Sequence, residues 1–370
     1  MKPLSMFYYL VNNKRKLVPV ILSISLSVMF FYFLFLAGTQ SRESSASTYL
    51  NPLKAYSRIT SNKGIPEELV DSLNAQTAIE KILPLHTFPH TNITRALGNG
   101  SAGIFFVRDN DIKYMMGLMN LKLTEGRLPE EKNEILLHWS IAANNKLKLG
   151  DIFKDTNEIQ DNFKIVGILD GSSIVGFVPT VIQGNSIKDW LKEDLIVIPK
   201  KGKLTQLNKF LDALPNSEGL QFETLSNVSA DIANSSKVLS VVMYILVIIV
   251  VAVLCITLGN TSSMYFYQRK NEFGVLSAIG YTRWEIGKRV LAESILAGVL
   301  GYISGVLLSL FCASAFNILL WNPMGESVPL YSSKGLLVTA IIPVFVVIAS
   351  VGPILRLLKK KDLINIIEAV

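Results

Sequence analysis

Four long apolar stretches are the feature that most constrains this chain. They cover residues 17–38, 238–258, 290–316 and 335–355 and carry almost no charge. A helix needs about 20 apolar residues to cross the hydrocarbon core of a bilayer, and each stretch supplies them. Half of the 370 residues are apolar, in keeping with this interpretation. We therefore predict an α-helical membrane protein with four transmembrane helices, the first of them an uncleaved anchor.

Basic side chains gather at one end of each apolar stretch. The segment before the first stretch contains Lys2, Lys14, Arg15 and Lys16. The segment between the second and third contains Arg269, Lys270, Arg283, Lys288 and Arg289, and the segment after the fourth contains Arg356, Lys359, Lys360 and Lys361. By the positive-inside rule these segments, and with them both termini, are predicted to be cytoplasmic. The positive charge forms no groove with interleaved aromatic residues, so the expected surroundings are membrane lipid and no nucleic acid.

The polar block between the first two stretches is large enough to bury a core of its own. Over residues 39–236 it holds 21 basic and 23 acidic residues, and neither of the two cysteines of the chain falls in it. Its first part, residues 47–97, favours helix, and residues 97–103 are rich in turn-forming residues. Strands are predicted at 104–107, 134–138, 163–169 and 195–198, and helices at 139–147 and 204–214. We predict one large α+β extracytoplasmic domain between transmembrane helices 1 and 2.

The apolar stretches and the charges together divide the chain into nine segments. These are a cytoplasmic amphipathic N-terminus (1–16), the first transmembrane helix (17–38), the extracytoplasmic α+β domain (39–236), the second transmembrane helix with a stalk (237–260), a cytoplasmic coupling segment (261–289), the third transmembrane helix (290–316), a short external loop (317–334), the fourth transmembrane helix (335–356) and a cytoplasmic tail (357–370). Residues 226–240 contain no Gly or Pro, which leaves two interpretations: a rigid helical stalk that transmits motion, or merely the outer end of the second transmembrane helix.

A patterned segment separates the second and third stretches. Residues 268–286 read QRKNEFGVLSAIGYTRWEI. This segment resembles the cytoplasmic segment of FtsX-like and MacB-like ABC transporter permeases, in which R-x-x-E-x-G-x-L-x-A-x-G precedes a short helix and an acidic residue. The matching positions are Arg269, Glu272, Gly274, Leu276, Ala278, Gly280 and Glu293. Residues 123–129, 133–137 and 148–151 resemble the periplasmic core domain of the same family, and residues 352–356 its C-terminal close, whereas the resemblance does not extend to residues 41–118.

The resemblance implies that this segment docks a separate ABC ATPase subunit. The expected docking residues are Arg269, Glu272, Gly274, Ala278, Gly280, Arg283, Trp284 and Glu285. A short amphipathic helix with basic and aromatic side chains suits a groove on a soluble partner. The alternative, a basic loop at the lipid surface without a partner, explains the charges but not the order of the motif residues. The sequence contains no G-x-x-x-x-G-K-[ST] motif, so we expect no cofactor in this chain, and ATP and Mg²⁺ on the partner ATPase.

Small side chains recur at every fourth position of the third apolar stretch. They are Ala297, Gly301, Gly305, Ser309 and Ala313. Such small-xxx-small faces let helix backbones approach closely in lipid. We predict that Ala297, Gly301, Gly305 and Ser309 form a helix-packing interface, within the chain or between protomers.

Residues that carry catalysis or bind metals are sparse. His86 and His90 are four residues apart, but Pro84 and Pro89 stand among them, and His138 is distant. Neither H-E-x-x-H nor G-x-S-x-G occurs. We predict no enzyme, and no catalytic, cofactor-binding or metal site.

The interpretation that fits these features is the permease subunit of a MacB-like ABC transporter in a bacterial cell (inner) membrane. By resemblance, it pairs with a second copy or a related permease chain. ATP hydrolysis on the partner then moves the extracytoplasmic domain to export an amphiphilic or peptide-like substrate, with an extracytoplasmic adaptor as a further partner. Two alternatives stay open: an FtsX-like signalling subunit that activates a cell-wall hydrolase, and a lipoprotein-releasing permease.

Overall fold

The computed structural model describes residues 14–61, 63–95, 99–154, 162–180, 194–214 and 219–360. They belong to two compact units. The helical unit comprises Met1–Ala37, Val238–Ala315 and Pro329–Val370, and the α+β unit comprises Gly38–Lys237 and Phe316–Val328. The predictions made for residues 1–13 and 361–370 lie outside the described residues.

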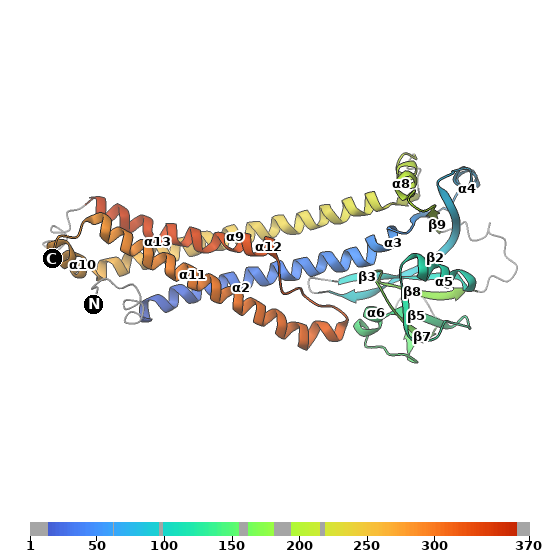
Figure 1. Cartoon of the computed structure of the whole chain (residues 1–370), viewed down its shortest axis with the longest axis horizontal. Helices are drawn as coiled ribbons and strands as arrows, with labels where there is room; N and C mark the ends of the chain where they lie inside the picture. Colours follow the sequence, from blue (N-terminus) through green and yellow to red (C-terminus); the bar gives the residue numbers. More distant parts are fainter. Residues whose placement is uncertain are drawn as a thin grey trace. The chain divides into compact units, whose positions relative to one another are not determined.

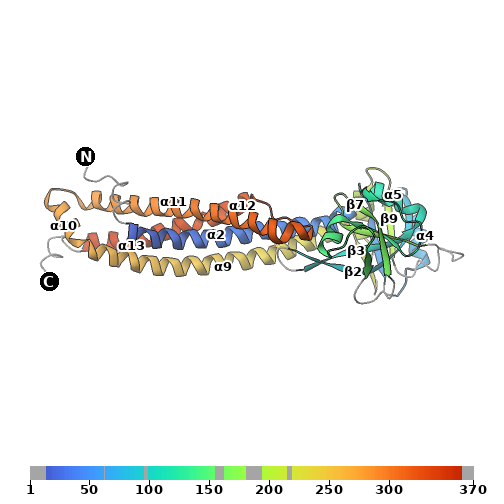
Figure 2. The same cartoon turned by 90° about the horizontal axis from the view of Figure 1, so that it is seen from below.

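Four long helices carry the apolar stretches (Figures 1 and 2). They are α2 (Lys14–Ser45), α9 (Leu225–Gln268), α11 (Arg283–Phe316) and α13 (Ile341–Lys360), the last preceded by the short α12 (Ser333–Thr339). In the part of the chain that the structure describes, the candidate membrane spans are Leu17–Leu53, Leu225–Met264, Trp284–Met324 and Ser333–Gly352. The chain is a multi-pass membrane protein, because each of these helices is apolar over a length sufficient to span a bilayer.

The core of the helical unit forms where three of these helices meet. Ile24 and Val28 of α2 pack in one cluster with Val247 and Val251 of α9 and with Val346 of α13. All five side chains are buried. The outward faces of the same helices carry exposed apolar side chains, the pattern expected of helices that face lipid.

The small residues of α11 lie against α2. A Cβ atom at Gly301 would fall 2.8 Å from Cβ of Ile24, and one at Gly305 would fall 2.6 Å from the Ser25 carbonyl oxygen. Ala297 and Ser309, on the same face of α11, are buried. The two backbones therefore approach so closely that only glycine fits at the points of contact.

The α+β unit is built on one mixed sheet. In the described residues its strand order is β10-β1-β9-β2-β3-β8-β5-β7-β4, with β6 paired to β7. The strands are β1 (Ser57–Ser61), β2 (Ile79–Thr94), β3 (Asn99–Arg108), β4 (Lys122–Gly126), β5 (Glu134–His138), β6 (Ile152–Lys154), β7 (Asn162–Asp170), β8 (Val175–Thr180), β9 (Asp194–Pro199) and β10 (Leu220–Glu223).

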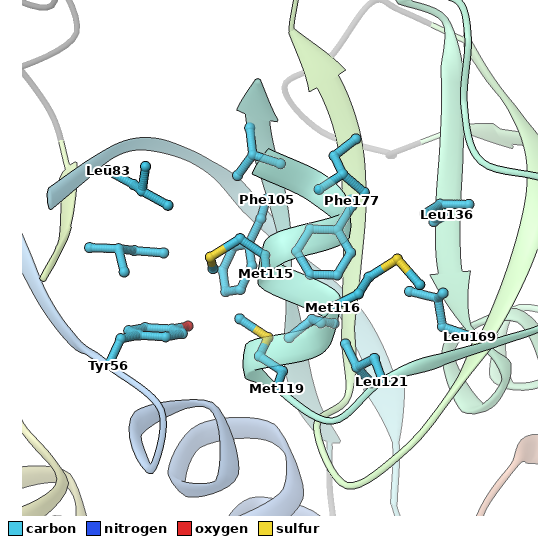
Figure 3. Close-up of a cluster of buried hydrophobic side chains, with 14 of the residues drawn as sticks. Tyr56, Leu83, Phe105, Met115, Met116, Met119, Leu121, Leu136, Leu169 and Phe177 are labelled. Carbon is cyan, nitrogen blue, oxygen red and sulfur yellow. The ribbon is translucent and has the colours of Figure 1, made fainter. Parts of the chain in front are cut away.

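Short helices pack on this sheet. They are α4 (Glu67–Asn74), α5 (Asp109–Leu118), α6 (Trp139–Asn144) and α8 (Leu204–Asp212), and a π-helical turn (Ala46–Leu50) with α3 (Asn51–Leu53) leads into β1. Figure 3 shows how α5 contributes to the core: Met115 and Met119 lie in the same buried cluster as Phe105 of β3 and Phe177 of β8. Such flexible side chains fill irregular gaps between strands.

The α+β class is confirmed, as are the predicted strands at 134–138, 163–169 and 195–198, which are β5, β7 and β9. Two local predictions are wrong. The helix-leaning region 47–97 contains the 16-residue strand β2, and residues 99–103, predicted as turn, belong to β3. In both cases the hydrogen bonds between neighbouring strands outweigh local propensity.

Gly126 and Arg127 hold the β4–β7 region of this sheet. Gly126 has φ of +80°, and a Cβ there would lie 2.1 Å from the Val166 carbonyl oxygen, so no other residue fits. Arg127 donates from Nη1 to Oε2 of Glu134 at 2.9 Å and from Nη2 to Oε1. Glu134 is buried, and hydrogen bonds from Arg127 and from the backbone NH groups of Glu130 and Glu131 lower its pKa to about 2.

Acid should therefore weaken the α+β unit through Glu134. A carboxylate whose pKa is lower in the folded state stabilises the fold at neutral pH, and this contribution disappears as the pH falls from about 5 to about 2. Glu134→Gln should lower the free energy of unfolding at pH 7 by about 1–3 kcal/mol, allowing for the half-exposed Arg127, and this difference should vanish near pH 2. Thermal unfolding of the full chain in detergent at several pH values measures it. Glu125→Gln, a change at an exposed carboxylate, is the control, and equal acid sensitivity in all three proteins would contradict the assignment.

The contact between α11 and α2 should contribute to the melting temperature of the protein. Gly301→Leu should lower the melting temperature in detergent by several degrees, because the new side chain would overlap Ile24. Val299→Leu adds bulk on an exposed face of the same helix and should leave melting unchanged. If the two variants melt alike, α11 and α2 do not pack through Gly301.

Candidate functional site

The motif segment between α9 and α11 folds as a short helix and a turn. Helix α10 (Lys270–Ala278) follows Arg269 directly. Gly280, two residues after the end of α10, has φ of +96°, and the Tyr281 NH donates to the Leu276 carbonyl oxygen at 3.1 Å. This is a Schellman C-cap, which needs a left-handed residue after the helix. Because a Cβ at Gly280 would meet nothing within 4 Å, backbone conformation alone selects glycine there.

Helix α11 begins with a reciprocal cap. The Thr282 NH donates to Oε2 of Glu285 at 2.7 Å, and the Glu285 NH lies 3.3 Å from the Thr282 hydroxyl oxygen. This is the capping box expected of a T-x-x-E sequence. The adjacent caps of α10 and α11 leave only a few residues between the helices, so the direction of the chain at the turn is fixed.

A small apolar core holds α10 against α11. Phe273 of α10 is buried with Ile286 and Val290 of α11, and Leu276 and Tyr281 pack on them. The side chains of α10 that face α11 are thus separated from those that face outward.

Four alternating charges tie this core to the end of α9. Arg269 donates to Glu272 through Nε (2.8 Å) and Nη2 (3.1 Å), and to Oε2 of Glu293 through Nη1 (3.0 Å). Arg289 donates to Oε1 of Glu293 from Nε (3.3 Å) and lies 3.8 Å from Glu272. The guanidinium of Arg269 also lies over the Phe273 ring, 4.7 Å from its centre. Each buried charge in this network has an opposite partner, which offsets its desolvation.

The outer face of the segment is apolar. Val275, Ile279 and Trp284 expose 64%, 69% and 66% of their surface, and the Lys288 ammonium lies over the Trp284 ring. Val275 lies in α10, Ile279 just after it and Trp284 in the first turn of α11. Large exposed apolar side chains gathered within so short a segment are typical of a site that another molecule covers. We refer to Val275, Ile279 and Trp284 as the docking face.

The structure divides the predicted docking residues between two roles. Arg269 and Glu272 belong to the internal ion-pair network, Gly280 and Glu285 form the caps, and Gly274 is buried. Ala278 and Trp284 are exposed. Arg283 is the first residue of α11, and its side chain lies outside the described residues.

Val275, Ile279 and Thr282 were not among the residues predicted for the site, and the ion-pair role of Arg289 was not predicted either. The T-x-x-E spacing was a readable signal for Thr282. Arg289 stands four residues before Glu293 on one helix face, a spacing that predicts an ion pair. No local signal separates the exposed Val275 and Ile279 from the buried Phe273, because all three are apolar residues of one short amphipathic stretch.

Comparison with known proteins identifies the C-terminal part of the chain. Residues 242–361 match the FtsX-like permease C-terminal family. About the last third of the chain is therefore similar to FtsX-like permeases. The match includes α10, the docking face and the whole ion-pair network.

Relatives in two mycobacteria are similar over a longer stretch. Uncharacterised ABC transporter permeases of Mycobacterium bovis and Mycobacterium tuberculosis are 23% identical to this chain over 237 residues. The similarity covers 64% of this chain and 62% of each relative. The chain is thus matched to somewhat less than two thirds of the length of these permeases.

Solved structures resemble part of the chain. The periplasmic region of MacB from Actinobacillus actinomycetemcomitans matches with a TM-score of 0.29 and 16% identity, covering 49% of this chain and 94% of that structure. The extracellular domain of the noncanonical ABC-type transporter YknZ from Gram-positive bacteria matches with a TM-score of 0.27 and 12% identity, covering 46% of this chain and all of that structure.

Proposed function

We propose that this chain is the membrane-spanning subunit of an ABC transporter and that its ATPase subunit binds the docking face. The observation that carries the proposal is the exposure of Val275, Ile279 and Trp284 on a segment whose inner side is fixed by ion pairs and caps. A rigid surface loses little conformational entropy when it binds, so its apolar contacts contribute directly to affinity. The family match and the mycobacterial permeases support the same partner.

The ion-pair network connects the docking face mechanically to the long helices α9 and α11. Arg269 follows the last residue of α9, and its partner Glu293 lies on α11, so a displacement of α10 pulls on both helices. Helix α9 is continuous from Leu225 to Gln268, and 44 residues span about 66 Å at 1.5 Å per residue. A push by the ATPase is then carried along α9 without an intervening break.

In this proposal, ATP and Mg²⁺ reside on the partner ATPase, and this chain supplies force transmission. It works with a second copy or a related permease chain in a bacterial inner membrane, with both termini cytoplasmic. An amphiphilic or peptide-like substrate is handled on the far side, where an extracytoplasmic adaptor joins the assembly. The absence of charged residues from the middle of the apolar stretches supports force transmission over passage of a polar solute through the bilayer.

The docking proposal is tested with the ATPase subunit that co-purifies with the tagged chain. Ile279→Asp and Trp284→Ala should each weaken ATPase binding to the chain in nanodiscs by about tenfold or more, as expected for large apolar side chains at the centre of an interface. Melting temperatures should stay at the wild-type value, because both side chains are exposed. Ile152→Asp, the same change at an exposed isoleucine of β6, is the matched control. Wild-type affinity in both docking-face variants would refute the proposed surface.

Orientation has a separate test. In a background with Cys255 and Cys312 replaced by Ala, single cysteines at Lys132 and at Lys288 should react with a membrane-impermeant maleimide from opposite sides of the membrane. Intact cells should label the cysteine at position 132, and inside-out vesicles the one at 288. Labelling of both from the same side would contradict the predicted topology.

A further inference from the structure

A cavity of about 590 Å³ lies within the α+β unit. Its walls come from the first residues of the unit, the junction of β5 with α6, the end of β7, and the segment 316–328. The lining residues are Gln40, Glu43, Ser44, Ser47, His138, Trp139, Ser140, Asp170, Gly171, Ile174, Asn322, Gly325, Glu326 and Ser327. This volume falls within the range of about 300–1,000 Å³ that small-molecule sites occupy.

The segment that closes the cavity is held in place before any ligand binds. The side-chain amide of Asn317 donates to the Val328 carbonyl oxygen at 2.8 Å, and the Val328 NH donates to Oδ1 of Asn317 at 2.7 Å. The Asn144 amide donates to the Met324 carbonyl oxygen at 3.0 Å. Gly325 has φ of +71°, and a Cβ there would lie 2.7 Å from Cα of Ser140. The cavity wall is thus preformed, which favours binding.

The lining carries negative charge and no lysine or arginine. Glu43, Asp170 and Glu326 are its charged residues. Glu326 is only 6% exposed, and its carboxylate accepts hydrogen bonds from the Gln40 amide and from the Ser44 hydroxyl, the latter at 2.7 Å. Within the residues that the structure describes, no ion pair neutralises it. Burying a carboxylate whose hydrogen-bond donors are all neutral costs desolvation free energy, and a cation that enters the cavity would offset this cost.

The histidine in the lining does not supply the missing positive charge. His138 Nδ1 lies 2.8 Å from the Ser140 hydroxyl oxygen, and Nε2 lies 3.2 Å from the Gly171 carbonyl oxygen. A neutral ring that donates from Nε2 and accepts at Nδ1 satisfies both contacts. Burial lowers the pKa of His138 below its usual value, which keeps the ring neutral at physiological pH.

Two observations restrict the chemistry of the cation. The indole of Trp139 lines the cavity while 43% exposed, and an aromatic face attracts organic cations. In the described part of the chain, no three His, Cys, Asp or Glu residues are grouped closely enough to hold a metal ion. A cation that spans separated carboxylates and also has an apolar surface fits this lining.

We propose that the cavity is a binding site for a small organic cation of the ammonium or amidinium class. The positively charged group of the ligand binds at Glu326, and Glu43 and Asp170 add electrostatic attraction. The apolar part of the ligand packs on Trp139 and Ile174. The inference goes beyond the proposed function, because it assigns a ligand site in the α+β unit that requires no ATPase.

Benzamidine, benzamide and benzoate form a matched probe series that is positive, neutral and negative in nearly one shape. With the full chain in phosphatidylcholine nanodiscs, and empty nanodiscs as blank, saturation-transfer NMR should detect benzamidine, with benzamide at least tenfold weaker and benzoate unbound. Benzylamine should displace benzamidine, and Ca²⁺ should not. Equal binding of benzamide would overturn the assignment of a cation site, and displacement by Ca²⁺ would replace it with a metal site.

Variants locate the site. Glu326→Gln keeps the shape and removes the charge, and should weaken benzamidine binding about tenfold. Glu43→Gln and Asp170→Asn are changes at exposed residues that do not threaten folding, and each should weaken it severalfold. Glu68→Gln, an exposed carboxylate of α4 outside the lining, is the matched control. Unchanged affinity in the Glu43 and Asp170 variants overturns the proposal even if the Glu326 variant fails to fold. ATPase binding at the docking face should be unaffected in all of them, so failure here and failure of the docking proposal are distinguishable.

Discussion

The bilayer interior offers no hydrogen-bonding partner to the backbone, and the rest of this structure depends on that constraint. Helices α2, α9, α11 and α13 satisfy their own NH and C=O groups, so each can lie in lipid. In lipid, helices gain little from the hydrophobic effect when they associate, so close packing must stabilise the bundle. Gly301 and Gly305 do so by letting α11 approach α2 at backbone distance, while valine and isoleucine side chains fill the remaining space between α2, α9 and α13.

At the corner between α10 and α11, ion pairs and helix caps set the direction of the chain. Arg269, Glu272, Arg289 and Glu293 form one network around the α10–α11 corner, and the Gly280 and Thr282 caps set the turn between the two helices. The motif that resembles a docking sequence is therefore largely a folding motif. Its conspicuous charged residues hold the segment together, and the surface that we propose for a partner consists of the exposed Val275, Ile279 and Trp284.

Sequence reasoning recovered the parts of the fold with strong local signals. The four apolar stretches and the buried strands β5, β7 and β9 all follow from periodicity or from residue preference near one place in the chain. It failed for β2 and for the start of β3. The first half of β2 becomes strand because β9 lies beside it, and such pairing between distant segments leaves no trace in a local window. Residues 99–102 of β3 become strand because they pair with residues 91–94 of β2.

Hydropathy and short spacings are local properties, so the membrane spans and the motif in residues 268–293 can be recognised from the amino-acid order alone. The folded chain was needed to see which motif residues face inward, that Gly301 and Gly305 contact α2, and that Phe316–Val328 belongs with the α+β unit. It was also needed to see that Glu326 is buried beside Gln40 and Ser44, more than 280 residues away. Contacts of that range depend on how the whole chain packs, so no stretch of sequence encodes them alone.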